Sequence, residues 1–192
     1  MIDLLADLLL LALMMLALYG AGRALRRLVR LDFWCRAADL AYAFAFGLGA
    51  VATLLFGLAL VGWLRPAAGW MVLAAGVALA ALQVRDLLGD PRALWGAARR
   101  LLATSWFVKI AALLALSFVI ANLVADLAPP TEGDTVHQYL LVPRYWVAEG
   151  RYVQPSHIWA ATLPGNMMML SAWALLLNGS TSLAALITGF GM

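Results

Sequence analysis

The chain has 192 residues, of which 65% are hydrophobic and 12% are charged, whereas a soluble domain usually carries about 25% charged residues. This shortage of charge excludes an ordinary water-facing surface. The formal net charge of +3 does not indicate a nucleic-acid partner, because the arginines stand at the ends of apolar runs, as topology signals of membrane proteins do. The only cysteine, Cys35, excludes a disulfide within the chain.

Apolar runs of roughly membrane-spanning length dominate the first two thirds of the chain. A bilayer core of about 30 Å needs roughly 20 apolar residues per helical crossing. Such runs cover residues 2–21, 38–64, 67–82 and 107–127, the third being slightly short. The first run is too long for the core of a signal peptide, and it carries Asp3 and Asp7 where an export signal needs basic residues. Residues 1–127 are therefore predicted to form a four-helix transmembrane region.

The basic residues predict how these helices are oriented. Cytoplasmic segments of membrane proteins carry the excess of Lys and Arg, and alternating spans place ten basic residues on one side against three on the other. The amino terminus and residues 128–165 are therefore predicted to be extracytoplasmic, in a bacterial inner (cytoplasmic) membrane. The ten are Arg23, Arg26, Arg27, Arg30, Arg36, Arg85, Arg92, Arg99, Arg100 and Lys109, and the three are Arg65, Arg144 and Arg151.

A basic amphipathic segment is predicted near residues 88–104, on the cytoplasmic side. Asp90 and Pro91 suit a helix cap and a first helical turn. Arg92, Arg99 and Arg100 fall opposite an apolar face, so the segment is predicted to lie flat on the anionic leaflet. The alternative is a site for a lipid phosphate or a partner. The apolar face consists of Leu94, Trp95, Ala98, Leu101 and Leu102.

The one long polar segment, residues 128–165, holds both histidines and both glutamates of the chain, and with them the candidates for chemistry. Asp134 stands just before a helix-compatible run over residues 135–148, so one interpretation is a helix N-cap. The other interpretation is that Asp134 acts as a general base or holds a divalent cation such as Mg²⁺ or Mn²⁺. Glu132 precedes it by two residues, and His137 lies one turn later on the same helix face.

Three cationic side chains of this loop, Arg144, Arg151 and His157, are candidates for holding a lipid phosphate. Their alternative role is anchoring at the membrane interface beside aromatic residues, which is favoured for Arg151. The helix over residues 135–148 is predicted to lie along the membrane surface on an apolar stripe, and Pro143 either kinks it or starts a second short helix. The stripe consists of Val136, Leu140 and Val147.

Residues 166–192 are predicted to contain further transmembrane segments that are incomplete within the sequence. An apolar run of about a dozen residues does not cross a bilayer, so the sequence is expected to be truncated or to be the front part of a longer protein. Together these features predict an all-α integral membrane protein. It would be a multi-pass bundle of about five transmembrane helices with short interfacial helices in the outer loop.

Residues 128–150 resemble the first outer loop of bacterial GT-C-type membrane glycosyltransferases. The similarity rests on residue types and intervals that run from Pro129-Pro130 through Asp134 and Tyr139-Leu140 to Pro143-Arg144 and Glu149-Gly150. The chain departs from the family at Gln138-Tyr139, where the family often has Tyr-His, and its histidine is displaced to His137.

The resemblance implies a multi-helix enzyme that transfers a sugar from a polyprenyl-phosphate donor at the outer face of the membrane. It implies Asp134 as the catalytic base or metal-linked acid, with Tyr139 among the supporting residues. Two functions of other classes remain open from the residues alone. One is a non-catalytic multi-pass subunit that packs against the helices of other membrane subunits, and the other is a small transporter-like bundle.

Overall fold

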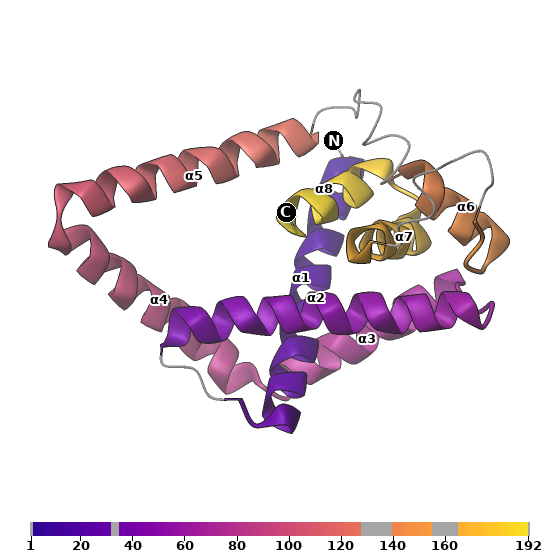
Figure 1. The fold of residues 1–192 in the computed structure, drawn as a ribbon, viewed down its shortest axis with the longest axis horizontal. Coiled ribbons are helices and arrows are strands. Elements are labelled where there is room, and N and C mark those ends of the chain that lie inside the picture. The colour runs from indigo at the N-terminus through magenta and orange to yellow at the C-terminus, as the bar shows by residue number, and fades with distance from the viewer. Residues whose placement is uncertain (1, 32–34, 128–139, 155–164, 192) are drawn as a thin grey trace.

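The computed structural model describes residues 2–31, 35–127, 140–154 and 165–191. Within these ranges the chain forms helices and turns and no strand, which confirms the predicted all-α class (Figure 1). The helices in chain order are α1 (Ile2–Val29), α2 (Arg36–Leu60), α3 (Pro66–Ala81), α4 (Val84–Thr104), α5 (Trp106–Leu127), α6 (Val142–Glu149), α7 (Asn166–Asn178) and α8 (Thr181–Gly191).

Two helices are long and apolar enough to cross a membrane by length and composition, α1 over Leu4–Val29 and α2. The apolar helix α3, the Trp106–Ala121 part of α5 and α7 are shorter. The five-span bundle therefore stays a prediction. α1 also continues to Val29 instead of ending near residue 21, so Arg23, Arg26 and Arg27 lie on the helix itself.

Helices α1, α2 and α3 approach one another through glycines. A Cβ added to Gly22 of α1 would clash with the carbonyl oxygen of Ala43, and one added to Gly47 of α2 would clash with the carbonyl oxygen of Leu18. Gly76 of α3 meets α1 in the same way. Figure 1 shows α2 running across α1 instead of alongside it. Such backbone contacts at small residues are typical of helix packing in membranes.

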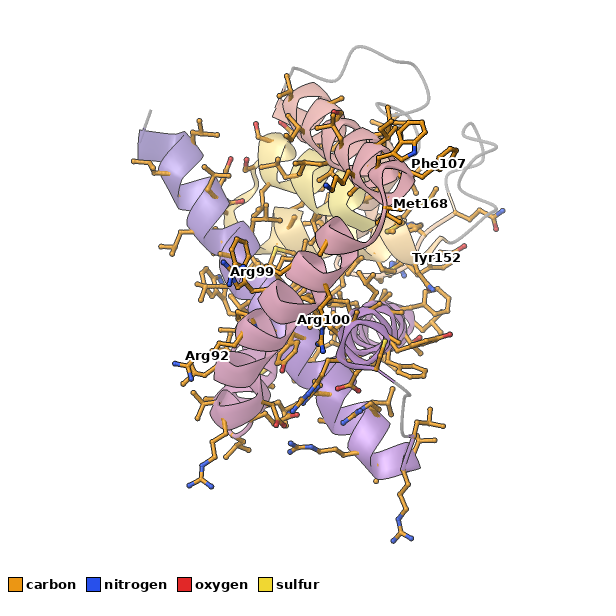
Figure 2. All side chains as sticks on the ribbon, turned by 90° about the vertical axis from the view of Figure 1, so that its left-hand side faces the viewer. Arg92, Arg99, Arg100, Phe107, Tyr152 and Met168 are labelled. Carbon is orange, nitrogen blue, oxygen red and sulfur yellow. The ribbon has the colours of Figure 1, made fainter. Side chains whose placement is uncertain are left out.

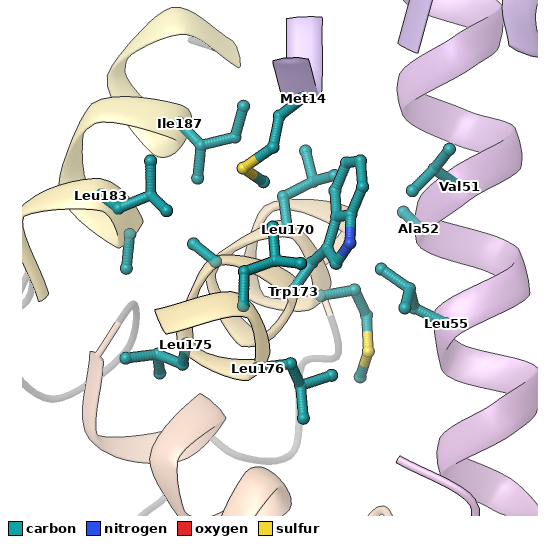
Figure 3. Close-up of a cluster of buried hydrophobic side chains, with 14 of the residues drawn as sticks. Met14, Val51, Ala52, Leu55, Leu170, Trp173, Leu175, Leu176, Leu183 and Ile187 are labelled. Carbon is teal, nitrogen blue, oxygen red and sulfur yellow. The ribbon is translucent and has the colours of Figure 1, made fainter. Parts of the chain in front are cut away.

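Helix α7 lies at the centre of the apolar core. Its 13 residues extend over about 20 Å, less than a bilayer core of about 30 Å, and residues 168–177 are all buried. The Nε1–H of Trp173 donates a hydrogen bond to the carbonyl oxygen of Gly69 in α3 at 3.0 Å. Figure 3 shows the side chains around α7, which include Met14 of α1, Val51, Ala52 and Leu55 of α2, and Leu183 and Ile187 of α8.

A tight turn joins α7 to α8. Gly179 ends α7 with a φ of +71°, and its N–H donates to the carbonyl oxygen of Leu175 at 2.9 Å. Glycine favours this left-handed position because it has no Cβ. The Oγ of Ser180 then accepts a hydrogen bond from the N–H of Leu183 at 3.2 Å, which caps the start of α8. The apolar segment after residue 165 is thus a pair of short helices.

Helices α4 and α5 extend away from this core. In Figure 1, α4 leads outward from the end of α3, and α5 returns toward α8. Side chains 109–121 of α5 are all exposed within the chain, although residues 110–121 are apolar apart from Ser117. A helix that is apolar all round needs an apolar environment, such as lipid or other helices.

Candidate functional site

Most of the residues that the sequence predicts for chemistry lie outside the described ranges. This applies to Asp134 and to the supporting candidates Glu132, His137, Tyr139 and His157. The predicted Mg²⁺ or Mn²⁺ site at Asp134 and Glu132 is therefore untested. Within the described ranges, no group of three or more His, Cys, Asp or Glu side chains is placed to hold a metal ion. Arg144 and Arg151 are described, and both belong to the segment around α6.

Helix α6 matches the later part of the predicted outer-loop helix. It runs over Val142–Glu149 with Pro143 in its first turn, where proline is tolerated because the first N–H groups have no helical partner. Pro143 therefore lies in the first turn of α6; whether it also kinks a longer helix depends on residues 135–139, which lie outside the described ranges. Gly150 ends α6 with a φ of +67°, as expected of a residue that takes the left-handed conformation without a Cβ clash.

The inner face of α6 is fixed by aromatic contacts. Trp146 is fully buried, and its Nε1–H donates to the carbonyl oxygen of Val153 at 2.7 Å. The ring of Tyr152 lies 5.3 Å from that of Trp146 and 5.4 Å from that of Phe56 in α2, in each case between centroids. Trp146 therefore packs within the protein, although the sequence suggests a residue at the membrane interface.

Two backbone hydrogen bonds hold this segment against the end of α2. The N–H of Leu64 donates to the carbonyl oxygen of Gly150 at 2.9 Å, and the N–H of Tyr152 donates to the carbonyl oxygen of Ala59 at 2.9 Å. Because Ala59 and Leu64 flank the carboxyl end of α2, the segment 140–154 is anchored beside the α2–α3 turn. The predicted outer loop thus lies beside the turn before Arg65, a residue that the predicted topology also assigns to the outside.

The outer face of α6 carries its charged residues. Arg144, Tyr145 and Glu149 are exposed, as is Arg151 just after the helix. Arg151 pairs with Glu149 at 3.7 Å, and both side chains are more than half exposed, so this pair contributes little stability. Arg144 has no ion pair among the described residues. The two arginines thus differ: Arg151 lies near the carboxylate of Glu149, and Arg144 has no such neighbour among the described residues.

A second polar site, which we call the arginine–aspartate cluster, joins the carboxyl end of α1 to the starts of α2 and α4. Arg23 is 1% exposed and pairs with Asp39 of α2 and, at 2.9 Å, with Asp86 of α4. Arg26 also pairs with Asp39, and Arg27 also pairs with Asp86. Burial of such charges is costly unless they are paired, so the cluster fixes the ends of the three helices relative to one another.

The electrostatics of the cluster favour the charged form of Asp86. The hydrogen bond from Arg23 is the main cause that lowers the pKa of Asp86 below its usual value, and the charges of Arg23 and Arg27 act in the same direction, against partial burial. The Arg23 guanidinium also lies 5.5 Å from the centre of the Tyr19 ring. With each carboxylate facing arginines, the arrangement suits a structural clamp better than proton transfer.

In the sequence, these arginines are interpreted only as topology signals, and nothing singles out Asp39 or Asp86. A usable signal is present, however. Arg23, Arg26 and Arg27 are three and four residues apart and therefore share one helix face. Asp39 lies in the first turn of a strongly apolar helix, where a buried acid requires a cationic partner. The pairing across helices could not be read from either segment alone.

A third polar contact joins the start of α1 to the α7–α8 turn. Asp7 is 6% exposed, and its two carboxylate oxygens accept hydrogen bonds from Nδ2 of Asn178 and Oγ of Ser180, both at 2.7 Å. Because Ser180 also caps α8, Asp7 stabilises the turn that positions both short helices. In the sequence Asp7 serves only as an argument against a signal peptide.

The chain matches no family model, no curated protein and no solved structure with which it was compared.

Proposed function

We propose that this chain is a membrane-embedded glycosyltransferase, or the amino-terminal part of one, that transfers a sugar from a polyprenyl-phosphate donor at the extracytoplasmic face. The observation that carries the proposal is the anchoring of α6 against the end of α2 with Arg144 left exposed. α6 is the described part of the segment that resembles the first outer loop of GT-C-type enzymes. A segment that is anchored at the end of an apolar helix, as residues 140–154 are, is a suitable support for a phosphate-binding side chain such as Arg144.

The grouping of helix ends supports the predicted topology. The arginine–aspartate cluster brings together the carboxyl end of α1 and the amino ends of α2 and α4, which are the ends assigned to the cytoplasm. The hydrogen bonds around Gly150 bring α6 to the carboxyl end of α2, which is assigned to the outside. The two sets of contacts therefore agree with the division of ten basic residues against three.

The proposed reaction assigns separate roles to Asp134 and Arg144. Asp134 takes the proton from an acceptor hydroxyl, whose oxygen forms a bond to the anomeric carbon of the sugar. The bond between that carbon and the phosphate oxygen breaks, and polyprenyl phosphate leaves with both electrons. Arg144 donates hydrogen bonds to the phosphate as it gains charge. In the alternative, Asp134 does not act as the base but holds a metal ion together with Glu132.

Phosphate recognition is tested with farnesyl phosphate, a short polyprenyl phosphate, added to the detergent-solubilised protein. We expect it to raise the unfolding temperature, whereas farnesol, which lacks the phosphate, leaves that temperature unchanged. Arg144→Gln should abolish the increase. Arg151→Gln should retain it, because Arg151 is already paired with Glu149. An equal increase with farnesol, or an unchanged response in Arg144→Gln, would count against the proposed role of Arg144.

One observation favours the second candidate, a non-catalytic subunit. The exposed apolar surface of α5, which includes Leu113, Leu114 and Phe118, suits packing against helices of another membrane protein. A subunit would keep its cellular function with Asp134→Asn and lose it with Leu114→Arg, which places a charge on this surface. The glycosyltransferase is expected to lose its function with Asp134→Asn.

A further inference from the structure

Helix α4 carries an exposed row in which arginines alternate with apolar side chains. The row, which we call the α4 row, consists of Arg85, Leu88, Arg92, Trp95 and Arg99. This corrects one detail of the sequence prediction: Trp95 does not lie opposite Arg92 and Arg99 but stands between them, in contact with Arg99. Its members are three or four residues apart, so they lie along one line on the helix surface. Leu88 and Trp95 are each 66% exposed. An exposed row of this kind suits a surface that is both apolar and anionic.

The side chains of the α4 row act together. The Arg99 guanidinium lies over the Trp95 ring at 5.8 Å from its centroid, a cation–π contact that holds the charge beside an aromatic surface. Figure 2 shows Arg92 and Arg99 projecting from one side of the α4 ribbon and Arg100 from the other. Arg92 and Arg99 therefore present two charges in the same direction.

The position of α4 leaves this row uncovered by the rest of the described chain. The helix is held at its start by the pairs of Asp86 with Arg23 and Arg27 and continues at its end into α5. Figure 1 shows its later part, toward α5, standing apart from α1, α2 and α3. The clamp at Asp86 thus fixes one end of a helix whose row stays exposed among the described residues.

We propose that α4 lies on the bilayer surface and binds the phosphate headgroups of anionic phospholipids through Arg85, Arg92 and Arg99. Charge complementarity favours an anionic leaflet. Tryptophan concentrates at the membrane interface, and arginine can extend its charged end to the headgroups while its stem stays in apolar surroundings. Leu88 and Trp95 select membrane lipid over free phosphate, because free phosphate offers no apolar surface. The proposal does not depend on the glycosyltransferase reaction.

The experiment uses the whole chain, reconstituted in phosphatidylcholine vesicles with and without phosphatidylglycerol. In a Cys35→Ser background, a fluorescent NBD label is attached to Leu88→Cys or, separately, to Gly89→Cys. Serine can keep the hydrogen bond that Cys35 accepts from Ala38, and a Cβ at Gly89 meets nothing within 4 Å. The two labels point about 100° apart around the helix. Doxyl-labelled phosphatidylcholine or phosphatidylglycerol then serves as quencher.

We expect lipid quenching to be strong at Leu88→Cys and weak at Gly89→Cys, and doxyl-phosphatidylglycerol to quench more than doxyl-phosphatidylcholine. Each arginine near an anionic surface contributes about a fivefold preference. Arg92→Gln with Arg99→Gln should therefore remove most of the preference for phosphatidylglycerol. The matched control, Arg65→Gln with Arg151→Gln, changes the net charge equally and should retain it. Equal quenching at both labels, or no preference for phosphatidylglycerol in the unsubstituted row, would overturn the proposal.

Discussion

Asp86 at the start of α4 forms an ion pair with the buried Arg23 of α1, with 2.9 Å between the carboxylate Oδ2 and the guanidinium Nη2. Arg23 pairs at the same time with Asp39 of α2. One arginine therefore connects three helices whose residues are up to 63 positions apart in the sequence. This connection fixes the direction in which α4 leaves the core, and so the placement of the α4 row.

Replacing Asp86 with Asn should destabilise the protein by about 1–3 kcal/mol, because Arg23 loses one charged partner within a buried site. Thermal unfolding in detergent measures the change. Glu149→Gln removes a carboxylate from the exposed pair with Arg151 and should cost at most about 1 kcal/mol. Equal losses from the two substitutions would show that the cluster adds no more than a surface pair.

The stability contributed by Asp86 should depend on pH. Arg23 lowers the pKa of Asp86 in the folded state below the ordinary value of 3.8, so folding favours the ionised carboxylate. The contribution is fully present above about pH 4 and is lost as the pH falls through the lowered pKa. Asp86→Asn should accordingly show a weaker loss of stability on acidification than the parent protein. Parallel pH profiles of the two proteins would contradict this assignment.

The crossing of α1 and α2 predicts opposite effects for two glycine substitutions. Gly22→Ala places a methyl group against the backbone of Ala43 and should destabilise the protein by about 1–3 kcal/mol, as overpacking does. Gly49→Ala meets nothing within 4 Å and should be neutral or stabilise α2 by up to about 1 kcal/mol. Unfolding temperatures of the two variants test the crossing, which would be wrong if Gly22→Ala were as well tolerated as Gly49→Ala.

Ser180 has two roles at the α7–α8 turn, and its removal should show both. Ser180→Ala loses the hydrogen bond to the buried Asp7 and the cap on Leu183, which together should cost about 1–3 kcal/mol of stability. Ser182→Ala changes an exposed residue of α8 and should stay within about 0.5 kcal/mol of the parent. The pair is compared by chemical or thermal unfolding. Equal unfolding free energies of the two variants would show that the contact between Ser180 and Asp7 does not stabilise the core.

The predicted topology is tested with single cysteines in a Cys35→Ser background. Ser156→Cys should react with an impermeant thiol reagent in intact cells, because the basic residues assign this loop to the outside. Gly96→Cys on α4, where a Cβ meets nothing within 4 Å, should react only after the cells are lysed. The opposite labelling pattern would show that the predicted orientation in the membrane is wrong.

The all-α class and the separate apolar helices are predictable from the sequence because apolar composition and run length dominate it. Local signals also predict a helix up to residue 148 in the outer loop, and α6 ends close to that position, at Glu149; they leave open whether Pro143 kinks a helix or starts one. The burial of Trp146 was not predictable, because the sequence does not tell a tryptophan at the membrane interface from one packed against Tyr152. The pairing of Arg23 with Asp39 and Asp86 was also not predictable, because it depends on how α1 crosses α2. Backbone contacts at Gly22 and Gly47 set that crossing.

The proposed catalytic role of Asp134 is tested by replacing it with Asn in the complete protein and measuring sugar transfer from a polyprenyl-phosphate donor in isolated membranes. Asparagine remains a good helix cap, so a capping role predicts a loss of only a few tenths of a kcal/mol and near-normal transfer. It cannot take a proton and binds a divalent cation poorly, so a catalytic role predicts a fall of about 100-fold or more at an unchanged amount of folded protein. Glu132→Gln is the comparison and should be milder. We predict the large fall for Asp134→Asn; transfer close to that of the parent protein would contradict the catalytic assignment.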